Sequence, residues 1–330
     1  MTDSALSAGA LPVLAEGVRS GFTESRHAGS LVALDAAGRT VMSLGVPGEP
    51  CFPRSSVKPL QAAAMVRAGL DVPDDLLAVV CASHSGEDMH VERVRRLLDG
   101  AGLDESALQC PPDMPRDEDA RKKAAAAGTG PARIFMNCSG KHAGMLATCA
   151  VNGWPAGSYR DPGHPLQRAV RETVEELAGE KVAHTGVDGC GAPLFAFSLA
   201  GLARAFRAVV TAEPGTAERR VADAFRTFPE LTSGTKRTEA ALMRGVPGLL
   251  NKAGAEGVDA AALADGSAIA VKIADGSQRA RVPVTVAALR ALGVAAPALD
   301  ELGSAPVFGG GEAVGTVAAA AVIRPSAPRP

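Results

Sequence analysis

The sequence has few aromatic residues, no surplus of positive charge and no long apolar run. Aromatic side chains make up 3% of its 330 residues, including one Trp and one Tyr. Lys and Arg number 34 against 36 Asp and Glu, so no excess of positive charge is available for nucleic-acid phosphates. The longest uncharged stretch, residues 143–159, is interrupted by Asn152, Gly153 and Pro155, and a bilayer span needs about 20 apolar residues. We therefore expect a protein that binds neither nucleic acid nor membranes.

The cysteines and the N-terminus are typical of an intracellular protein. Six cysteines in a chain of this length do not make a disulfide framework, and a cytosolic chain keeps them reduced. Asp3 lies near the start and no basic segment leads into an apolar run, so we predict no secretory signal and a cytoplasmic location. Hydrophobic residues at 46% and charged residues at 21% indicate a folded core.

Alternating apolar positions near both ends of the chain predict strands. Residues 31–35 and 40–45 flank a turn that contains Gly38, as in a hairpin. Further strands are predicted for residues 13–25, 248–251, 267–273 and 314–323.

The middle of the chain predicts helices, because apolar residues recur there at i, i+3 and i+4. These segments are 57–69, 87–100, 117–127, 140–151, 165–178, 195–210 and 216–228. The pattern predicts an α+β fold, in which one antiparallel sheet from the N- and C-terminal strands meets an inserted helical region at a cleft. The sheet lobe would comprise about residues 10–55 and 245–324, and the helical lobe about residues 56–244. The Pro-rich tail after Arg324 is expected to fray.

The first candidate catalytic group is Ser55 with Lys58. Three residues apart on a helix, they would lie on one face, one turn apart. A serine needs a base, and a lysine can be that base when burial and a helix N-terminus lower its pKa. Pro59 favours a helix start at Lys58. The alternative is a capping serine with a surface lysine. The second Ser-x-x-Lys, residues 233–236, is interpreted as a Gly-containing helix cap with a solvated lysine.

The second candidate is the small, polar segment 81–87, which follows the apolar run 76–80 and precedes a helix. A serine on such a turn can point into a cleft, and the segment offers Ser83 and Ser85. The alternative is a helix cap, with Ser85 paired to Asp88 or Ser83 acting near Gly86 and Glu87.

The third candidate combines residues 137–144 with residues 187–191. The first segment places a thiol, an ammonium and an imidazole at a predicted helix start, and the second adds Asp188 and another thiol. Zinc accepts such ligands, although the spacing is not that of a zinc finger. The alternative is a set of buried, inert cysteines.

The fourth candidate is a lysine at the end of a predicted strand. Lys252 precedes Gly254, which would let a substrate approach the backbone closely. Lys272 lies on a similar strand, where alternation predicts an outward side chain. Residues 309–315 do not form a dinucleotide fingerprint, because the glycine spacing is wrong and a strand-like run follows them. We therefore expect no organic cofactor.

Taken in order, these motifs resemble the bacterial L-asparaginase II family of the rhizobial type, which is unrelated to the bacterial asparaginases that use threonine nucleophiles. The motifs are RSSVKP, ASHSGE, NCSGKHAGML, VDGCGAP, NKAGAEG and AVKIADG. The resemblance extends from about residue 20 to residue 323. It implies one domain over residues 1–330, with a fold similar to the serine β-lactamases and the serine-dependent glutaminases.

The resemblance also implies roles for single residues. Ser55 with Lys58 would match the family's first Ser-Lys tandem, and Ser83 with Lys252 the second, while Ser85 and Lys272 compete for the second tandem. The expected zinc ligands are Cys138, Lys141 and Cys190. The expected substrate-binding residues are Arg54, His142 and Asp188.

The implied reaction is hydrolysis of L-asparagine to L-aspartate and ammonia by a homodimeric enzyme. A serine activated by lysine would form an acyl-enzyme that water cleaves, and N–H groups at the start of the Ser55 helix would stabilise the oxyanion. Zinc would orient the substrate more than generate hydroxide, and a lysine ligand must be deprotonated. Two alternatives remain: a glutaminase or other serine acyl-transfer hydrolase of this fold, and a non-catalytic metal-binding protein.

Overall fold

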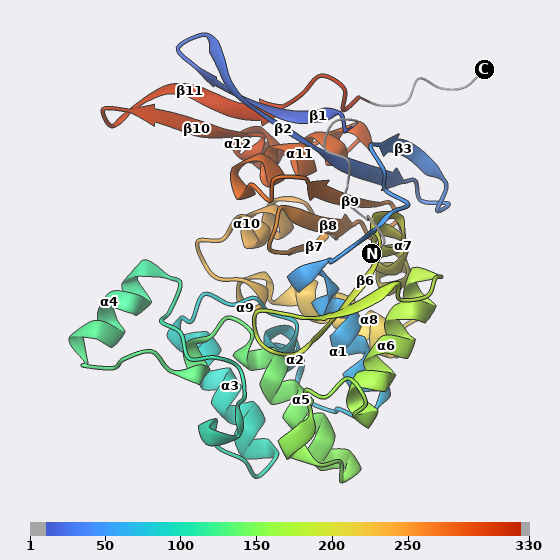
Figure 1. Ribbon diagram of the computed structural model, residues 1–330, viewed down its shortest axis with the longest axis vertical. Helices are drawn as coiled ribbons and strands as arrows, with labels where there is room; N and C mark the ends of the chain where they lie inside the picture. The colour runs from blue at the N-terminus through green and yellow to red at the C-terminus, as the bar shows by residue number, and fades with distance from the viewer. Residues whose placement is uncertain (1–10, 325–330) are drawn as a thin grey trace.

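The computed structural model describes residues 11–324, and the tail expected after Arg324 lies outside them. Within this part of the chain, eight strands form one antiparallel sheet in the order β10-β11-β1-β2-β9-β8-β7, with β3 also paired to β2 (Figure 1). Their bounds are β1 Val13–Arg19, β2 Phe22–Leu34, β3 Thr40–Leu44, β7 Leu250–Ala253, β8 Val258–Ala262, β9 Ala268–Ile273, β10 Ser304–Gly309 and β11 Glu312–Ala319. Because β1 lies between β11 and β2, the sheet is built from both ends of the chain, which confirms the predicted α+β architecture.

The chain between β3 and β7 is mainly helical and lies below the sheet in Figure 1. Its helices are α1 Lys58–Arg67, α2 Asp74–Val80, α3 Asp88–Gly100, α4 Glu118–Ala126, α5 Ser139–Asn152, α6 Pro165–Ala178, α7 Leu199–Thr211, α8 Ala217–Thr227, α9 Pro229–Thr232 and α10 Thr238–Gly245. A small sheet joins β4 Pro50–Cys51, β6 Pro193–Ser198 and β5 His184–Val187. Two later helices, α11 Gln278–Ala291 and α12 Pro297–Leu302, return to the large sheet.

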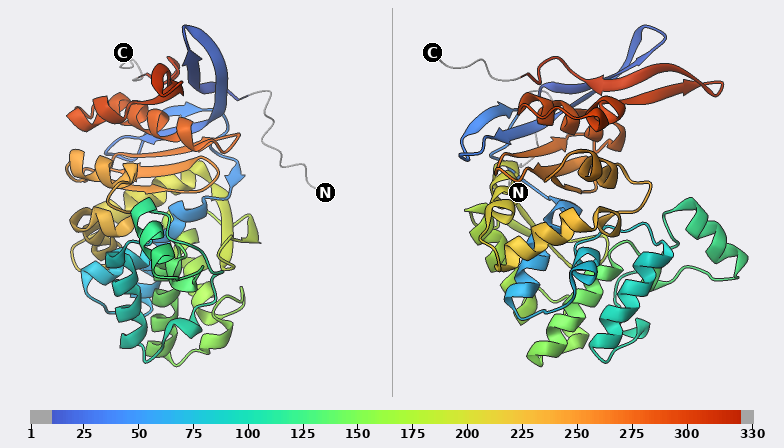
Figure 2. Two further views of the ribbon diagram at one scale, coloured as in Figure 1. Left: turned by 90° about the vertical axis from the view of Figure 1, so that its left-hand side faces the viewer. Right: turned by 180° about the vertical axis from the view of Figure 1, so that it is seen from behind.

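The large sheet is covered on both faces (Figure 2). Helix α7 packs against β2, β8 and β9, and α11 packs against β1, β9 and β11. Because successive side chains of a strand point to opposite faces, Val32 and Leu34 of β2 join the core that contains Phe206, whereas Leu31 and Ala33 join the second core. The sheet is therefore a fixed platform between two apolar layers. No helix in the described range 11–324 combines the length and apolar character that a membrane span requires.

Several predicted elements differ from the structure. Residues 195–210 were predicted as one helix, but the first four belong to strand β6, and α7 begins only after Ser198, whose hydroxyl accepts from the Gly201 N–H and caps the helix. Residues 13–25 contain a hairpin turn at Ser20 and Gly21, where Gly21 has φ +81°. The second Ser-x-x-Lys is not a cap, because α10 begins at Thr238.

Candidate active site

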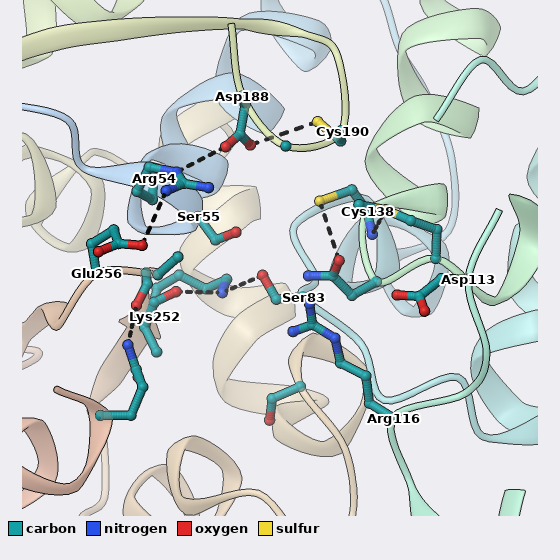
Figure 3. Close-up of a pocket in the computed structure, with 18 of the residues that line it drawn as sticks. Arg54, Ser55, Ser83, Asp113, Arg116, Cys138, Asp188, Cys190, Lys252 and Glu256 are labelled. Atoms are coloured by element: carbon teal, nitrogen blue, oxygen red, sulfur yellow. Dashed lines mark hydrogen bonds and ion pairs between the residues drawn. The ribbon is translucent and has the colours of Figure 1, made fainter. Parts of the chain in front are cut away.

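A cavity of about 680 Å³ opens where the sheet meets the helices (Figure 3). Seven of the sequence-predicted site residues line it: Arg54, Ser55, Ser83, Cys138, Asp188, Cys190 and Lys252. Lys58 and Lys141 are buried, at 1% and 2% exposure, and each contacts a lining residue. The third lysine, Lys272, is not in the lining. The structure therefore gathers residues from five separate sequence motifs at one place.

The wall that carries Ser55 is fixed against strand β7. The turn η1 Arg54–Val57 precedes α1, and the buried Ser56 hydroxyl donates to the Lys252 carbonyl at 2.9 Å. Gly254 has no room for a side chain, because a Cβ there would lie 2.5 Å from the Pro53 carbonyl oxygen. The close approach predicted at Gly254 is thus made by the protein's own backbone.

Backbone strain also marks this cavity. Three non-glycine residues of the described chain have positive φ, and two of them, Arg54 at +52° and Glu256 at +59°, line the cavity. Such conformations cost free energy and persist where the surroundings impose them, commonly at functional sites. Here Arg54 Nε donates to Asp188 Oδ1 at 2.9 Å, and Glu256 lies within 3.9 Å of the same guanidinium.

Ser83 is the serine that lysines reach. Its Oγ lies 3.0 Å from Lys58 Nζ and 2.9 Å from Lys252 Nζ. Lys58 Nζ also donates to the Ala82 carbonyl, and Lys252 Nζ to the Ala253 carbonyl. Both ammonium groups are therefore oriented by backbone oxygens and converge on one hydroxyl.

Ser55 and Lys58 do not form the predicted pair. Within residues 11–324, Ser55 Oγ makes no hydrogen bond, and Lys58 Nζ contacts the Ser83 turn instead. The reason is the backbone: Ser55 lies in the 3₁₀ turn η1, and α1 begins only at Lys58, so the two residues do not share a helical face.

The helix-cap alternative for the Ser83 motif is wrong. Helix α3 begins at Asp88 with Glu87 at its N-cap and without a side-chain cap. Ser85 Oγ donates to Glu87, which also accepts from Thr235, so these three residues tie two loops together. Ser85 does not line the cavity, whereas Ser83 does.

The pKa of Lys252 falls to about 7, chiefly because the amine is buried and also because Lys58 is nearby, while Glu239 opposes the shift. A substantial fraction of Lys252 is therefore neutral near pH 7 and able to accept a proton. Lys272 instead donates to the carbonyls of Glu256 and Ile273 and braces a turn. Lys272 is the one partly exposed residue of β9, as its predicted outward position requires, but the rest of the strand is buried on both faces and not half-buried.

Two thiols and a carboxylate meet on the opposite wall. One ligand atom each from Cys138, Asp188 and Cys190 lies within 4.8 Å of the others. A hydrogen bond from Cys138, with support from Lys141, lowers the pKa of Cys190 to about 5 against the effect of burial. The lowered pKa of Cys190 favours the thiolate, the form in which a thiol binds metal.

Lys141 is held as the counter-ion of this thiolate. Its Nζ donates to Cys190 Sγ at 3.1 Å. Burial lowers the pKa of Lys141, but the negative charges of Cys190 and Asp188 oppose that effect, and the net direction is upward. Two sulfurs and a carboxylate oxygen fit zinc. Lys141 itself fits only after it loses its proton.

His142 does not reach the cavity, contrary to the expectation that it binds substrate. It is fully buried, and its Nδ1 lies 2.6 Å from the Tyr159 hydroxyl. Although it neighbours Lys141 in the sequence, its position on α5 turns the imidazole into the core rather than toward Cys190.

Sequence reasoning missed a buried charge network behind strand β7. Arg281 donates to Glu239 Oε1 and to Asp259 Oδ2, each at 2.8 Å. Asp259 also accepts from Asn251, the residue before Lys252. These groups come from β7, β8, α10 and α11, and no local pattern links them. Also missed were Asp113 and Arg116, which line the cavity from the loop before α4.

The sequence profile of the L-asparaginase II family matches residues 15–319, nearly the whole chain. The chain therefore belongs to the L-asparaginase II family, and the family resemblance seen in its motifs is confirmed.

Comparisons with individual proteins are less informative. Among curated proteins there is no significant match. Two crystal structures are similar in part. Mglu in its native form has 14% identity and a TM-score of 0.43 over 76% of this chain and 59% of that chain. Mglu in its tris and glutamate form has 12% identity and a TM-score of 0.34 over 82% and 60%. The chain thus spans about 60% of the length of these structures.

Proposed function

We propose that this protein hydrolyses the side-chain amide of L-asparagine to L-aspartate and ammonia, with Ser83 as the nucleophile and Lys252 as its base. Membership of the L-asparaginase II family supports the amide substrate. The observation that carries the mechanism is the position of Ser83 Oγ, which lies within 3.0 Å of two buried lysine amines.

In the first step, neutral Lys252 takes the Ser83 proton as Oγ attacks the amide carbon. The pKa of Lys252, about 7, suits this exchange at neutral pH. The protonated amine then gives its proton to the leaving nitrogen, so that ammonia departs and a β-aspartyl ester remains on Ser83. In the second step Lys252 takes a proton from water as the water attacks the ester, and it returns that proton to Ser83 Oγ as aspartate is released. Lys58, held by the Ala82 carbonyl, would stabilise negative charge on Ser83 Oγ.

Ser55 is proposed to act on the substrate without being acylated. A serine without a base is a weak nucleophile, and no lysine contacts this hydroxyl. Its backbone N–H donates to no acceptor within the described range and is available to the oxyanion. We therefore still propose that N–H groups at the start of this helix bind the oxyanion, although Ser55 and Lys58 do not pair.

We also propose that Cys138, Asp188 and Cys190, together with Lys141, hold a zinc ion beside the substrate. The chemistry of the donors fits, as does their mutual approach within 4.8 Å. Lys141 would have to release its proton, since its Nζ now donates to Cys190. A bound zinc ion would supply positive charge that orients the substrate amide or carboxylate. Arg54 fixes Asp188 through Oδ1, and Oδ2 lies 3.6 Å from Cys190 Sγ.

The test is ammonia release from asparagine, glutamine and a β-lactam, assayed side by side with the purified chain. Asparagine should have the highest kcat/KM. Equal or faster turnover of glutamine would make the protein a glutaminase, and release from none of the three would refute the amidase assignment. We also propose, from the family resemblance, that the chain is a single domain and forms a homodimer in the cytoplasm. Sedimentation analysis tests the homodimer.

A further inference from the structure

We propose that Arg116 and Asp113 bind the α-carboxylate and the α-ammonium group of the substrate, and so restrict the enzyme to free amino acids. This inference rests on the proposed amidase function of Ser83. Both residues line the cavity, from the loop that precedes α4 (Figure 3). Figure 3 shows the Arg116 guanidinium extending toward Ser83, with Asp113 on the side of Cys138.

Arg116 differs from the other arginines of the cavity in having no protein partner. Arg54 is paired with Asp188 at 2.9 Å, and Arg237 with Glu239 at 3.5 Å. The Arg116 guanidinium makes no hydrogen bond or ion pair within residues 11–324. A planar guanidinium can bind a carboxylate through two parallel hydrogen bonds. Arg116 is therefore the free anion-binding group of this cavity.

Asp113 is the corresponding acidic group. Its Oδ1 accepts from the Met114 N–H, and no cation of the described chain pairs with it. The other carboxylates of the lining all lie near cations: Asp188 and Glu256 near Arg54, and Glu239 near Arg281. Asp113 and Arg116 are three residues apart and are not paired with each other. Together they complement a ligand that carries an ammonium group and a carboxylate on one carbon.

The loop that carries these charges is attached to the segment that carries Ser83. The backbone N–H groups of Arg116 and Asp117 both donate to the Ser85 carbonyl, at 2.7 and 2.9 Å. Pro115 packs so closely on Gly86 that a Cβ there would lie 2.9 Å from Pro115 Cα. The charged pair is thus fixed relative to the nucleophile, as a subsite must be.

The chemistry of asparagine matches this arrangement. Its α-carbon lies two bonds from the amide carbon, so an amide placed at Ser83 keeps both α-groups inside the same cavity. In a peptide the α-carboxylate and the α-ammonium group are replaced by neutral amides, so Arg116 and Asp113 would find no charged partner in the ligand. Arg116 is exposed and Asp113 half-buried in the open cavity, so a bound peptide would displace their water without replacing it by opposite charge. That loss of hydration is costly, which is how such a site rejects the wrong ligand.

The experiment combines two variants with substrates that each lack one group. Arg116→Gln should lower kcat/KM on L-asparagine by about 100-fold, the value typical of a lost charge-assisted contact, yet leave 3-aminopropanamide, which has no carboxylate, within about threefold of wild type. Asp113→Asn should lower kcat/KM on L-asparagine similarly but not on succinamic acid, which has no amine. Arg168→Gln and Asp99→Asn are matched controls, because both residues are exposed, make no side-chain hydrogen bond or ion pair within residues 11–324 and do not line the cavity.

The same variants are tested for binding of L-aspartate by calorimetry, so that the result does not depend on catalysis. A loss of affinity of about 100-fold in both variants supports the subsite even if the wild-type chain hydrolyses nothing, in which case only the proposed function fails. Unchanged aspartate affinity and unchanged asparagine turnover in Arg116→Gln would overturn the proposal. So would an equal loss on asparagine and on 3-aminopropanamide, because Arg116 would then act on the reaction and not on the carboxylate.

Discussion

Ser83 and Ser55 line the same cavity, but their surroundings differ. Ser55 has a lysine three residues away in the sequence, whereas Ser83 has lysines beside it only in the folded structure. Ser83 Oγ has two lysine amines within 3.0 Å, whereas Ser55 Oγ has no hydrogen-bond partner within the described range. Lys58, three residues from Ser55, serves the serine that is 25 residues away. A Ser-x-x-Lys spacing here marks a lysine that reaches the cavity wall, but it does not identify the serine that this lysine contacts.

The difference arises from where the helices begin. Because α1 starts at Lys58, its side chain is directed to the end of α2, where the Ala82 carbonyl accepts from Nζ. The turn after α2 holds Ser83 in place through its N–H, which donates to the Thr232 carbonyl. Lys252 arrives from β7, which the Arg281 network supports from behind. Ser83 is therefore contacted by residues of α1, α9 and β7, whereas the Ser55 hydroxyl is contacted by none of them.

The largest expected effect separates the two serines directly. Ser83→Ala should reduce kcat on asparagine by about 10⁴-fold or more, because it removes the nucleophile, whereas Ser55→Ala should cost about 10²-fold. Steady-state kinetics on variants with wild-type circular dichroism measures both. A larger loss in Ser55→Ala would reverse the assignment.

The next effect compares the lysines of β7 and β9. Lys252→Met should lower kcat by about 10³-fold, because it removes the base. Lys272→Met should keep kcat within a few-fold of wild type and lower Tm instead, since Lys272 braces the turn at Glu256. Steady-state kinetics and thermal melts of the two variants measure these effects. A larger loss of kcat in Lys272→Met would mean that the base lies on β9 and not on β7.

A pH profile sharpens the same comparison. Lys252 is active when neutral, and its pKa is about 7, so kcat/KM should rise with pH and level off above that value. Glu239 raises the pKa of Lys252, so Glu239→Gln should move this limb to lower pH. Glu312→Gln, at the exposed start of β11, is the control and should leave the limb in place. A limb that does not move in Glu239→Gln would mean that another group titrates.

The smallest effect concerns the metal wall. The purified chain should carry about one equivalent of zinc, and Cys190→Ser should lose it, whereas Asp188→Asn should weaken zinc by about 10- to 100-fold. Metal analysis and a competitive chelator titration measure these changes. The zinc site would be refuted if wild-type protein from zinc-supplemented medium contained no metal and both Cys138 and Cys190 reacted with an alkylating reagent in the folded state.

The sequence predicted the large sheet because residues 31–35 and 40–45 alternate around a turn that contains Gly38, and most helices because their apolar periodicity is strong. Residues 195–198 were misassigned because a fully buried strand has no alternation and merges with the apolar face of the helix that follows. Lys252 could be matched to Ser83 through family motifs, but the contact from Lys58 could not, since it depends on where α1 begins.

Other parts of the site had no local signal. Arg281, Glu239 and Asp259 meet only because α10, α11 and β8 pack together, and each is unremarkable in its own segment. Arg116 lies in a loop whose position depends on hydrogen bonds to Ser85. His142 shows the converse, since it stands inside a correctly identified motif and yet points into the core.

The most direct measurement of the central claim is the site of acylation. The enzyme is mixed with a slowly released β-aspartyl substrate such as the hydroxamate, quenched in acid within one turnover, digested and mapped by mass spectrometry. The account predicts a β-aspartyl ester on the peptide that contains Ser83, absent in Ser83→Ala and retained in Ser55→Ala. An ester on Ser55, or none on either serine at any quench time while turnover proceeds, would contradict it.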